Sequence, residues 1–270
     1  MKQLKFLMVA LTLLMGVSFT SCLDSGNGEN AYDGYGYFRT QSYMGTCFFV
    51  DLDGNRFYPT PESLSAMTSN GFKAESADLV IVYFKWVDEQ SGNGGSSSTA
   101  TDHNIVLVSV TPIDSYRAIS LPSEVGLENF ENAPIVTLNP TTNSNFGGNN
   151  TLQPFLYGPQ MVVLPISWKM EYKAETLAQH TFTLAYVEEA QQDGSELVLY
   201  LCHDKGTDEK TDFTNVAFKA FDIKSFMETI KNQTGSYPSK VIIKAKADMD
   251  GTTMPDDYTS YEIDSSSLNK

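Results

Sequence analysis

Short β-strand-like segments separated by turn residues fill most of this chain, and that pattern restricts its fold more than any other feature. The segments are rich in aromatic and β-branched residues, which favour strands, and Gly, Pro, Asn and Asp lie between them. In the first half of the chain the segments are 35–40, 45–51, 56–58, 77–88 and 104–110. The pattern predicts a mainly β fold.

A short helix is predicted after the third segment, over residues 61–67. Thr60 can cap this helix, Pro61 suits its first turn, and Gly71 ends it. Three strands, a helix and two further strands are the element order of an OB-type barrel. We therefore predict an OB-like five-stranded β-barrel with one short helix over residues 32–116. A small β-sandwich shares this element order and stays open as an alternative.

The second half of the chain predicts an antiparallel β-sandwich over residues 117–270. Its strand-like segments are 161–172, 181–187, 196–202, 216–223, 240–247 and 258–263. The polar run 139–150 predicts a long loop, and 225–231 predicts one or two helical turns. Lysines alternate with Val241, Ile243 and Ala245 in the fifth segment, which predicts a strand with one solvent-exposed face.

The N-terminal residues predict export and lipid attachment. Lys2 and Lys5 precede an apolar run over 6–17, and small residues lead to Cys22. Residues 1–21 therefore resemble a bacterial lipoprotein signal peptide, with Cys22 as the lipidated first residue of the mature chain. The apolar run is shorter than the ~20 residues that a membrane span needs. The polar, glycine-containing residues 22–31 predict a flexible tether between the lipid and the first domain.

The charge of the chain excludes one class of partner. Its formal net charge is −15, and removal of Lys2 and Lys5 with the signal makes the mature chain more acidic. Such a chain repels phosphate backbones, so we expect no nucleic acid partner. It also repels anionic lipid, so the expected membrane contact is the lipid on Cys22. We expect a location in the cell envelope, at the outer membrane, with the periplasmic or outward face left open.

Cysteine and histidine residues do not predict a catalytic or metal site. Cys47 and Cys202 can pair in an oxidising compartment, although their strand-like surroundings favour two separate buried thiols. Cys202, His203 and Asp204 are consecutive, and neighbours on a strand point to opposite faces, so they cannot act together. His103 and His180 have no zinc-type spacing. We predict no catalytic residue, no metal site and no cofactor.

Two Asp-x-Asp-Gly stretches need a separate interpretation. Residues 51–55 and 248–252 are similar in form to the start of a calcium loop, but neither has the later bidentate Glu that such a loop uses. A tight turn is the favoured interpretation for both, and 51–55 predicts a β-hairpin turn.

Aromatic residues of the first domain are the candidate ligand contacts. Tyr35, Tyr37 and Trp86, with Tyr32 and Phe38 nearby, can form a stacking platform on the strands. Barrel core and cross-strand pairing explain the same residues and stay open. The expected loops 91–100 and 139–150 are further possible contact surfaces.

The chain resembles the NigD-like lipoproteins of Bacteroidetes. The residues that carry this resemblance are the lipoprotein-type signal, the aromatic strand 35–38, the hairpin 49–59 and the acidic strand end 87–89. The resemblance implies an N-terminal OB domain, a C-terminal β-sandwich domain and a place in the cell envelope. It also implies an association with bacteriocin gene clusters, and it implies no catalytic residue.

These observations lead to one expected function and two alternatives. We expect a lipid-anchored envelope protein that binds another envelope protein, a peptide or a glycan and catalyses no reaction. The first alternative is an accessory or immunity factor linked to bacteriocin production. The second is an envelope carbohydrate-active enzyme, for which two carboxylates facing each other across a groove would be diagnostic.

Overall fold

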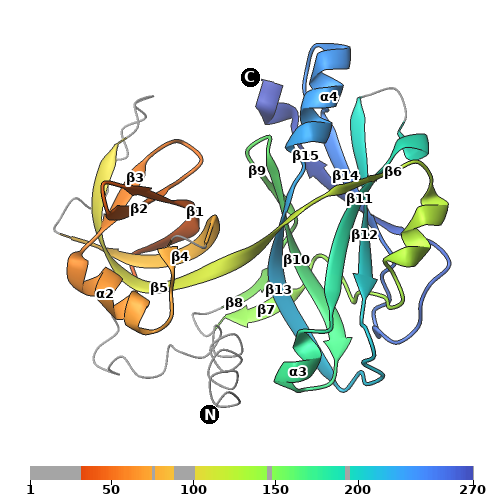
Figure 1. Cartoon of the computed structure of the whole chain (residues 1–270), viewed down its shortest axis with the longest axis horizontal. Helices are drawn as coiled ribbons and strands as arrows, with labels where there is room; N and C mark the ends of the chain where they lie inside the picture. Colours follow the sequence, from red (N-terminus) through yellow and green to blue (C-terminus); the bar gives the residue numbers. More distant parts are fainter. Residues whose placement is uncertain (1–31, 75–76, 88–100, 145–147, 192–194, 270) are drawn as a thin grey trace. The chain divides into compact units, whose positions relative to one another are not determined.

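The structure is a computed structural model that describes residues 32–74, 77–87, 101–144, 148–191 and 195–269. Strands dominate the described residues, as the sequence predicts (Figure 1). The chain divides into two compact units, with the boundary between Asp114 and Ser115, and we describe unit 1 and unit 2 separately. The expected signal at 1–21, the tether at 22–31 with Cys22, and the expected loop at 91–100 lie outside the described residues.

Five strands of unit 1 close into a hydrogen-bonded ring. In bonding order they are β3 (Arg56–Pro59), β2 (Thr46–Val50), β1 (Gly34–Tyr43), β4 (Leu79–Trp86) and β5 (Asp102–Arg117), and β5 pairs back with β3. The β3–β5 pairing is parallel and the other four pairings are antiparallel. The predicted hairpin joins β2 to β3. Oδ1 of Asp51 accepts hydrogen bonds from the backbone N–H of Asp53 at 2.9 Å and of Asn55 at 2.8 Å, which holds the turn.

Helix α2 (Pro61–Ser69) lies between β3 and β4, where the sequence predicts it. Oγ1 of Thr60 accepts a hydrogen bond from the Ser63 backbone N–H at 3.4 Å, and Pro61 occupies the first turn. Leu64 and Met67 of α2 pack against the ring's buried core. That core consists mainly of aromatic and β-branched side chains: Phe38, Phe49, Phe57, Phe72, Val80, Val82, Phe84 and Ile105.

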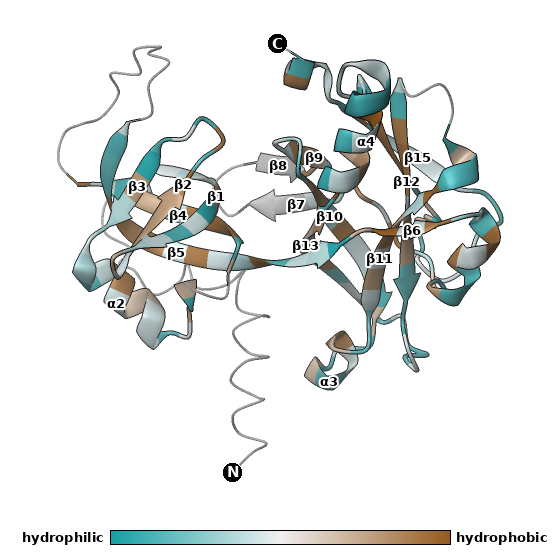
Figure 2. Cartoon of the chain, turned by 45° about the horizontal axis from the view of Figure 1, so that its top comes forward, coloured by the Kyte–Doolittle hydropathy of each residue, from teal (hydrophilic) through white to brown (hydrophobic). Residues whose placement is uncertain are grey.

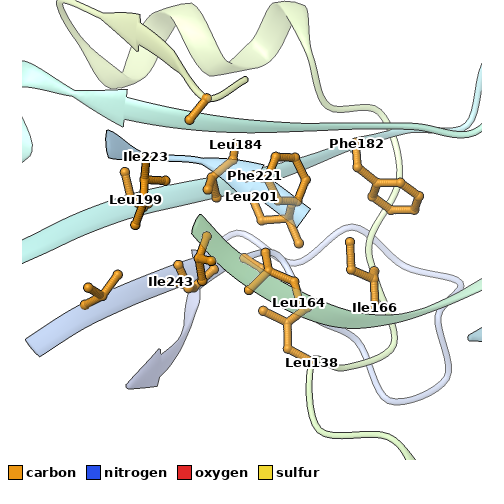
Figure 3. Close-up of a cluster of buried hydrophobic side chains, with 14 of the residues drawn as sticks. Leu138, Leu164, Ile166, Phe182, Leu184, Leu199, Leu201, Phe221, Ile223 and Ile243 are labelled. Carbon is orange, nitrogen blue, oxygen red and sulfur yellow. The ribbon is translucent and has the colours of Figure 1, made fainter. Parts of the chain in front are cut away.

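Unit 2 contains two packed groups of strands. In one, β10 (Met161–Met170) lies between β13 (Phe213–Asp222) and β9 (Phe155–Tyr157), and the end of β5 joins β13. The other has the order β15 (Thr259–Asp264), β14 (Lys240–Ala245), β12 (Glu196–Asp204), β11 (Thr181–Val187) and β6 (Ile119–Leu121). Buried leucine, isoleucine and phenylalanine side chains from both groups point toward one another (Figure 3). This shared core holds the two groups together.

The expectation of a wholly antiparallel sandwich is wrong for the five-stranded group. There β12 runs parallel to β14, and β11 runs parallel to β6. A parallel pair needs a crossover connection, and the chain between β12 and β14 supplies it through β13 and helix α4 (Lys224–Thr234). Helix α4, predicted as 225–231, is amphipathic (Figure 2) and buries Met227 and Ile230 in the core. The nearly continuous apolar run of β12 suits a central strand covered on both faces.

The predicted solvent-exposed face of β14 is only partly exposed. The 3-10 helix η4 (Glu124–Asn129) covers part of this sheet face and buries Leu127 against Tyr200 and Cys202. Lys244 donates a hydrogen bond from Nζ to the Tyr200 hydroxyl at 3.2 Å, and Nζ of Lys246 lies 3.0 Å from Oε1 of Glu131. The ammonium groups of Lys244 and Lys246 also lie over the rings of Tyr200 and Tyr258, at 5.1 Å and 5.4 Å from the ring centroids.

The predicted loop at 139–150 contains a small two-stranded sheet. Strands β7 (Thr141–Ser144) and β8 (Gly148–Thr151) pair antiparallel, and the hydroxyls of Thr141 and Thr151 lie 3.2 Å apart. The prediction of a long loop without strands is corrected in this range, because backbone pairing in a hairpin does not require apolar side chains. The remaining short elements are α3 (Ala174–Leu177), η5 (Glu188–Ala190) and η6 (Ser266–Asn269).

Candidate ligand-binding site

Three tyrosine rings gather near the start of β1 and the middle of β4. Tyr35 and Tyr83 are directly opposite in the β1–β4 pairing, and their rings stack with centroids 5.5 Å apart and an interplanar angle of 19°. Tyr32 turns its ring edge-on to both, at 6.1 Å from Tyr35 and 4.9 Å from Tyr83. Tyr35 is 61% exposed. We call Tyr32, Tyr35 and Tyr83 the tyrosine surface.

The local sequence explains why Tyr35 points outward. It lies between Gly34 and Gly36, and a Cβ on Gly34 would come within 2.7 Å of the Phe84 ring. The glycines therefore admit Phe84 and Phe38 on the core side, while strand alternation directs Tyr35 to the other face. Asp33 fixes the register, because its backbone N–H donates to the Phe84 carbonyl at 2.9 Å and its Oδ2 accepts from the Trp86 backbone N–H at 2.9 Å.

The hydroxyls of Tyr37 and Tyr83 are uncharged at neutral pH. Burial raises the pKa of Tyr37 to about 12, with further contributions from the neighbouring Tyr83 and Tyr35. Burial also raises the pKa of Tyr83, assisted by Tyr32 and Tyr35. Tyr37 follows Tyr35 by two positions and so shares its face of β1. This face can therefore donate and accept hydrogen bonds without adding to the negative charge of the chain.

The structure does not bring Trp86 to the tyrosine surface. Strand alternation places Trp86 with the core side of β4, where its ring contacts Phe84 at 4.9 Å, His103 at 5.4 Å and Phe57 at 6.2 Å. Phe38 is also a core residue. Of the aromatic residues that the sequence singled out, Tyr32, Tyr35 and Tyr37 share one region. The sequence analysis missed Tyr83, which completes this region. The alternation along β4 between core-facing and outward-facing residues was the signal that could have placed Tyr83 on the outward face.

The consecutive residues Cys202, His203 and Asp204 do not form a catalytic triad. Cys202 packs on the sheet face covered by η4, whereas the His203 ring stacks on Phe182 with centroids 4.7 Å apart. His203 instead contacts His180: Nε2 of His203 lies 2.8 Å from Nδ1 of His180. The sequence analysis missed this pair, although the hairpin between β11 and β12 brings the two positions together.

The two cysteine thiols are buried in different units. Cys47 belongs to the unit 1 core and Cys202 to unit 2. The favoured interpretation of two separate buried thiols is confirmed. Burial, with a further contribution from Glu131, raises the pKa of Cys202 to about 12, so this thiol is not a nucleophile at neutral pH.

Both Asp-x-Asp-Gly stretches direct carboxylate oxygens at their own backbone. Asp51 caps the β2–β3 turn, and Oδ2 of Asp248 accepts hydrogen bonds from the backbone N–H of Thr252 and Thr253, each at 2.9 Å. These bonds also lower the pKa of Asp248. Among the described residues, no group of three or more His, Cys, Asp or Glu is placed to hold a metal ion.

The deeper carboxylates are engaged by neighbouring polar groups. Glu131 accepts from Lys246 and from the Tyr258 hydroxyl, Glu124 accepts from the Tyr200 hydroxyl, and Asp208 lies 3.0 Å from Nε2 of His180. Such bonds favour a structural role for these acidic groups.

The fold is that of a mainly β protein with a closed five-strand ring in one unit and two packed strand groups in the other. It is similar to the solved structure of a "Putative lipoprotein" from Bacteroides fragilis, with 23% identity, 86% of this chain and 97% of that chain covered, and a TM-score of 0.65. It is also similar to a protein of unknown function from Bacteroides vulgatus, with 8% identity, 85% and 89% covered, and a TM-score of 0.54.

A NigD-like immunity protein from Bacteroides caccae matches with 12% identity, 87% of this chain and 93% of that chain covered, and a TM-score of 0.47. The match over most of the chain to the Bacteroides fragilis lipoprotein structure agrees with the resemblance predicted from the sequence. At these identities the matches show the fold alone. No protein-family model and no curated protein matches the sequence. In the part of the chain that the structure describes, no helix is long and apolar enough to cross a membrane.

Proposed function

We propose that this chain is a non-catalytic binding protein, held at the bacterial cell envelope by a lipid on Cys22, and that its tyrosine surface binds a carbohydrate. One observation carries the proposal: Tyr35 is 61% exposed, yet its ring is held parallel to that of Tyr83 with centroids 5.5 Å apart. An exposed aromatic ring in a fixed orientation is a prepared contact surface, because little side-chain entropy is lost when a ligand binds it.

The geometry suits a sugar ring. The exposed Tyr35 ring, stacked on Tyr83, offers an aromatic floor for the C–H face of a pyranose, and the perpendicular Tyr32 ring offers a wall beside it. The phenol hydroxyls can exchange hydrogen bonds with sugar hydroxyls. Burial raises the pKa of Tyr83, so its hydroxyl is neutral at physiological pH and a neutral sugar meets no charged phenolate there.

The proposal rests on this geometry and not on analogy with other folds. We interpret the five-strand ring as an OB-like barrel, a fold that often binds oligosaccharides through its second and third strands and neighbouring loops. The tyrosine surface lies on β1 and β4 instead. Fold likeness alone therefore does not supply the site.

The position of the tyrosine surface in the chain fits an envelope anchor. Tyr32 follows Cys22 by ten positions, and a fully extended chain of that length spans at most about 35 Å. A lipid on Cys22 would keep the surface near a membrane and the glycans attached to it. The similarity to the "Putative lipoprotein" of Bacteroides fragilis supports the anchor.

A glycan array with the soluble form, residues 23–270, tests the ligand. We expect binding of a neutral glycan, a loss of at least tenfold in affinity for Tyr35→Ala, and no change for Tyr43→Ala. Tyr43 is the matched control, because it lies at the other end of β1 and is 70% exposed. Binding of a peptide or an envelope protein in place of any glycan, or equal losses for both variants, would contradict the proposal.

Cell fractionation of the full chain tests the anchor separately. We expect wild type in the membrane fraction and Cys22→Ala as an unprocessed or soluble form. Protease treatment of intact cells then distinguishes an outward from a periplasmic face. A Cys22→Ala chain that matures normally and stays with the membrane would contradict lipid attachment at this residue.

A further inference from the structure

Three buried polar side chains of unit 2 form one hydrogen-bonded chain. His180 precedes β11, His203 lies near the end of β12, and Asp208 lies in the connection from β12 to β13. Nε2 of His180 is 3.0 Å from Oδ2 of Asp208, and Nδ1 of His180 is 2.8 Å from Nε2 of His203. Nδ1 of His203 is 2.9 Å from the Pro134 carbonyl oxygen. The three residues are between 3% and 9% exposed.

Each of these three contacts needs one proton. The Pro134 carbonyl oxygen only accepts, so Nδ1 of His203 must carry hydrogen. The His180–His203 contact joins two ring nitrogens, one of which must donate. The His180–Asp208 contact joins a ring nitrogen to a carboxylate oxygen, and without a proton two lone pairs would face each other in a buried site. The three hydrogen-bonded side chains therefore hold three protons together, whichever of the two contacting atoms carries each proton.

We infer that Asp208, His180 and His203 form a buried binding site for a single proton, which unit 2 takes up on folding at neutral and mildly alkaline pH. In the unfolded chain above the ordinary histidine pKa of about 6.5, the same groups hold two protons, one on each neutral imidazole. The folded chain holds one more, and this proton balances the charge of the buried Asp208 carboxylate.

The surroundings place the extra proton at the Asp208 end. Burial lowers the pKa of His203 to about 4, which keeps that ring neutral and leaves its Nε2 as the acceptor for His180. Asp208 has a lowered pKa despite its burial, because the backbone N–H groups of Lys210 and Glu171 and the His180 ring donate to it. The His180 ring lies between the other two groups, with Nδ1 facing Nε2 of His203 and Nε2 facing Oδ2 of Asp208.

Other charged groups near the site are paired or lie at its edge. Glu171 bonds to Lys173 and Lys210. Asp204 accepts from the Asn132 side chain and the Gly206 backbone N–H, and Lys205 follows it in the chain. The rings of Trp168 and Phe182 pack against the two histidines and exclude water from them. No second carboxylate of the described residues hydrogen-bonds to either histidine ring.

The proton count predicts a stability maximum near pH 6.5 from these groups. Above that pH the unfolded chain binds one proton fewer than the folded chain, so stability falls as pH rises until the folded site releases its proton. Below it, both unfolded histidines are charged while the folded His203 stays neutral, so stability falls as pH drops toward about 4. On each side of the maximum, the unfolding constant changes tenfold per pH unit. We call the fall in stability above pH 6.5 the alkaline arm and the fall below it the acid arm.

Two variants separate the arms in urea unfolding of residues 23–270, measured from pH 5 to pH 8.5. Gln in His203→Gln can still accept from His180 and donate to Pro134. We expect this variant to keep the alkaline arm and lose the acid arm. His180→Gln cannot hold the extra proton, so we expect loss of the alkaline arm with the acid arm kept. His103→Gln controls for the remaining histidine of the chain.

Nuclear magnetic resonance of the histidine ring nitrogens keeps the inference testable if a variant does not fold. At pH 7.5 we expect the folded wild type to show one ring protonated on both nitrogens and one neutral ring with hydrogen on Nδ1. Two neutral buried rings, together with a flat stability profile from pH 7 to pH 8.5, would overturn the inference. An alkaline arm that persists in His180→Gln would overturn it as well.

Discussion

The hydroxyl of Tyr258 donates a hydrogen bond to Oε1 of Glu131 at 3.1 Å, joining residues that are 127 positions apart. Lys246 approaches the same oxygen at 3.0 Å, and the Glu131 side chain is 5% exposed. The bond links the segment that follows η4 to the connection between β14 and β15. Both segments lie next to the five-stranded group of unit 2.

We expect Tyr258→Phe to lower the free energy of unfolding by about 1–3 kcal/mol, because Glu131 loses one donor in a buried position. Urea unfolding measures this change. Tyr172→Phe is the matched control, because Tyr172 is 60% exposed, and we expect less than about 0.5 kcal/mol there. Equal effects of the two variants would show that the Glu131 bond does not stabilise unit 2.

Leu199 of β12 is fully buried between the strand groups of unit 2. Leu199→Ala would remove apolar contacts and leave a cavity, and we expect a loss of about 2–5 kcal/mol in the free energy of unfolding. Val125, which is 73% exposed on η4, provides the control, since Val125→Ala should change stability by less than about 0.5 kcal/mol. A small effect at Leu199 would contradict the packing in Figure 3.

Gly251 combines a φ of +67° with a crowded position. A Cβ there would come within 2.5 Å of Cγ of Lys169 and 2.8 Å of Cγ2 of Val136. Gly45 has a φ of +83° and nothing within 4 Å of its Cβ position. We expect Gly45→Ala to cost about 1–2 kcal/mol from backbone strain alone and Gly251→Ala to cost more. Thermal unfolding of both variants should rank them in this order, and the reverse ranking would refute the close approach at Gly251.

Both buried thiols should be unreactive in the folded protein. Cys47 and Cys202 are buried, and the pKa of Cys202 is raised to about 12, so thiolate is scarce at pH 8. We expect a thiol reagent to label neither cysteine of residues 23–270 in buffer and to label both in urea. Absence of labelling in urea without a reductant would reveal a disulfide, and rapid labelling in buffer would show that the thiols are accessible.

Local patterns predicted the features whose cause lies in neighbouring residues. Thr60, Pro61 and Gly71 bound α2, and the Asp51 side chain holds the β2–β3 turn, because capping and turn bonds reach only a few residues along the chain. Alternation alone also indicates that Tyr35 faces away from Phe38. Local patterns did not predict which strands pair. The parallel pairing of β12 with β14 depends on the path of the chain between them, which passes through β13 and α4.

The sequence by itself determined the mainly β character of this protein, the place of helix α2, and an N-terminus typical of a lipoprotein, because strand propensity, capping and signal patterns are local properties. Only the tertiary structure decided that Tyr83 completes the tyrosine surface, that Trp86 lies on the core side, and that His180, His203 and Asp208 share a buried chain of hydrogen bonds. Each of these depends on the register between segments that are distant in sequence, and register is set by the packing of the whole core.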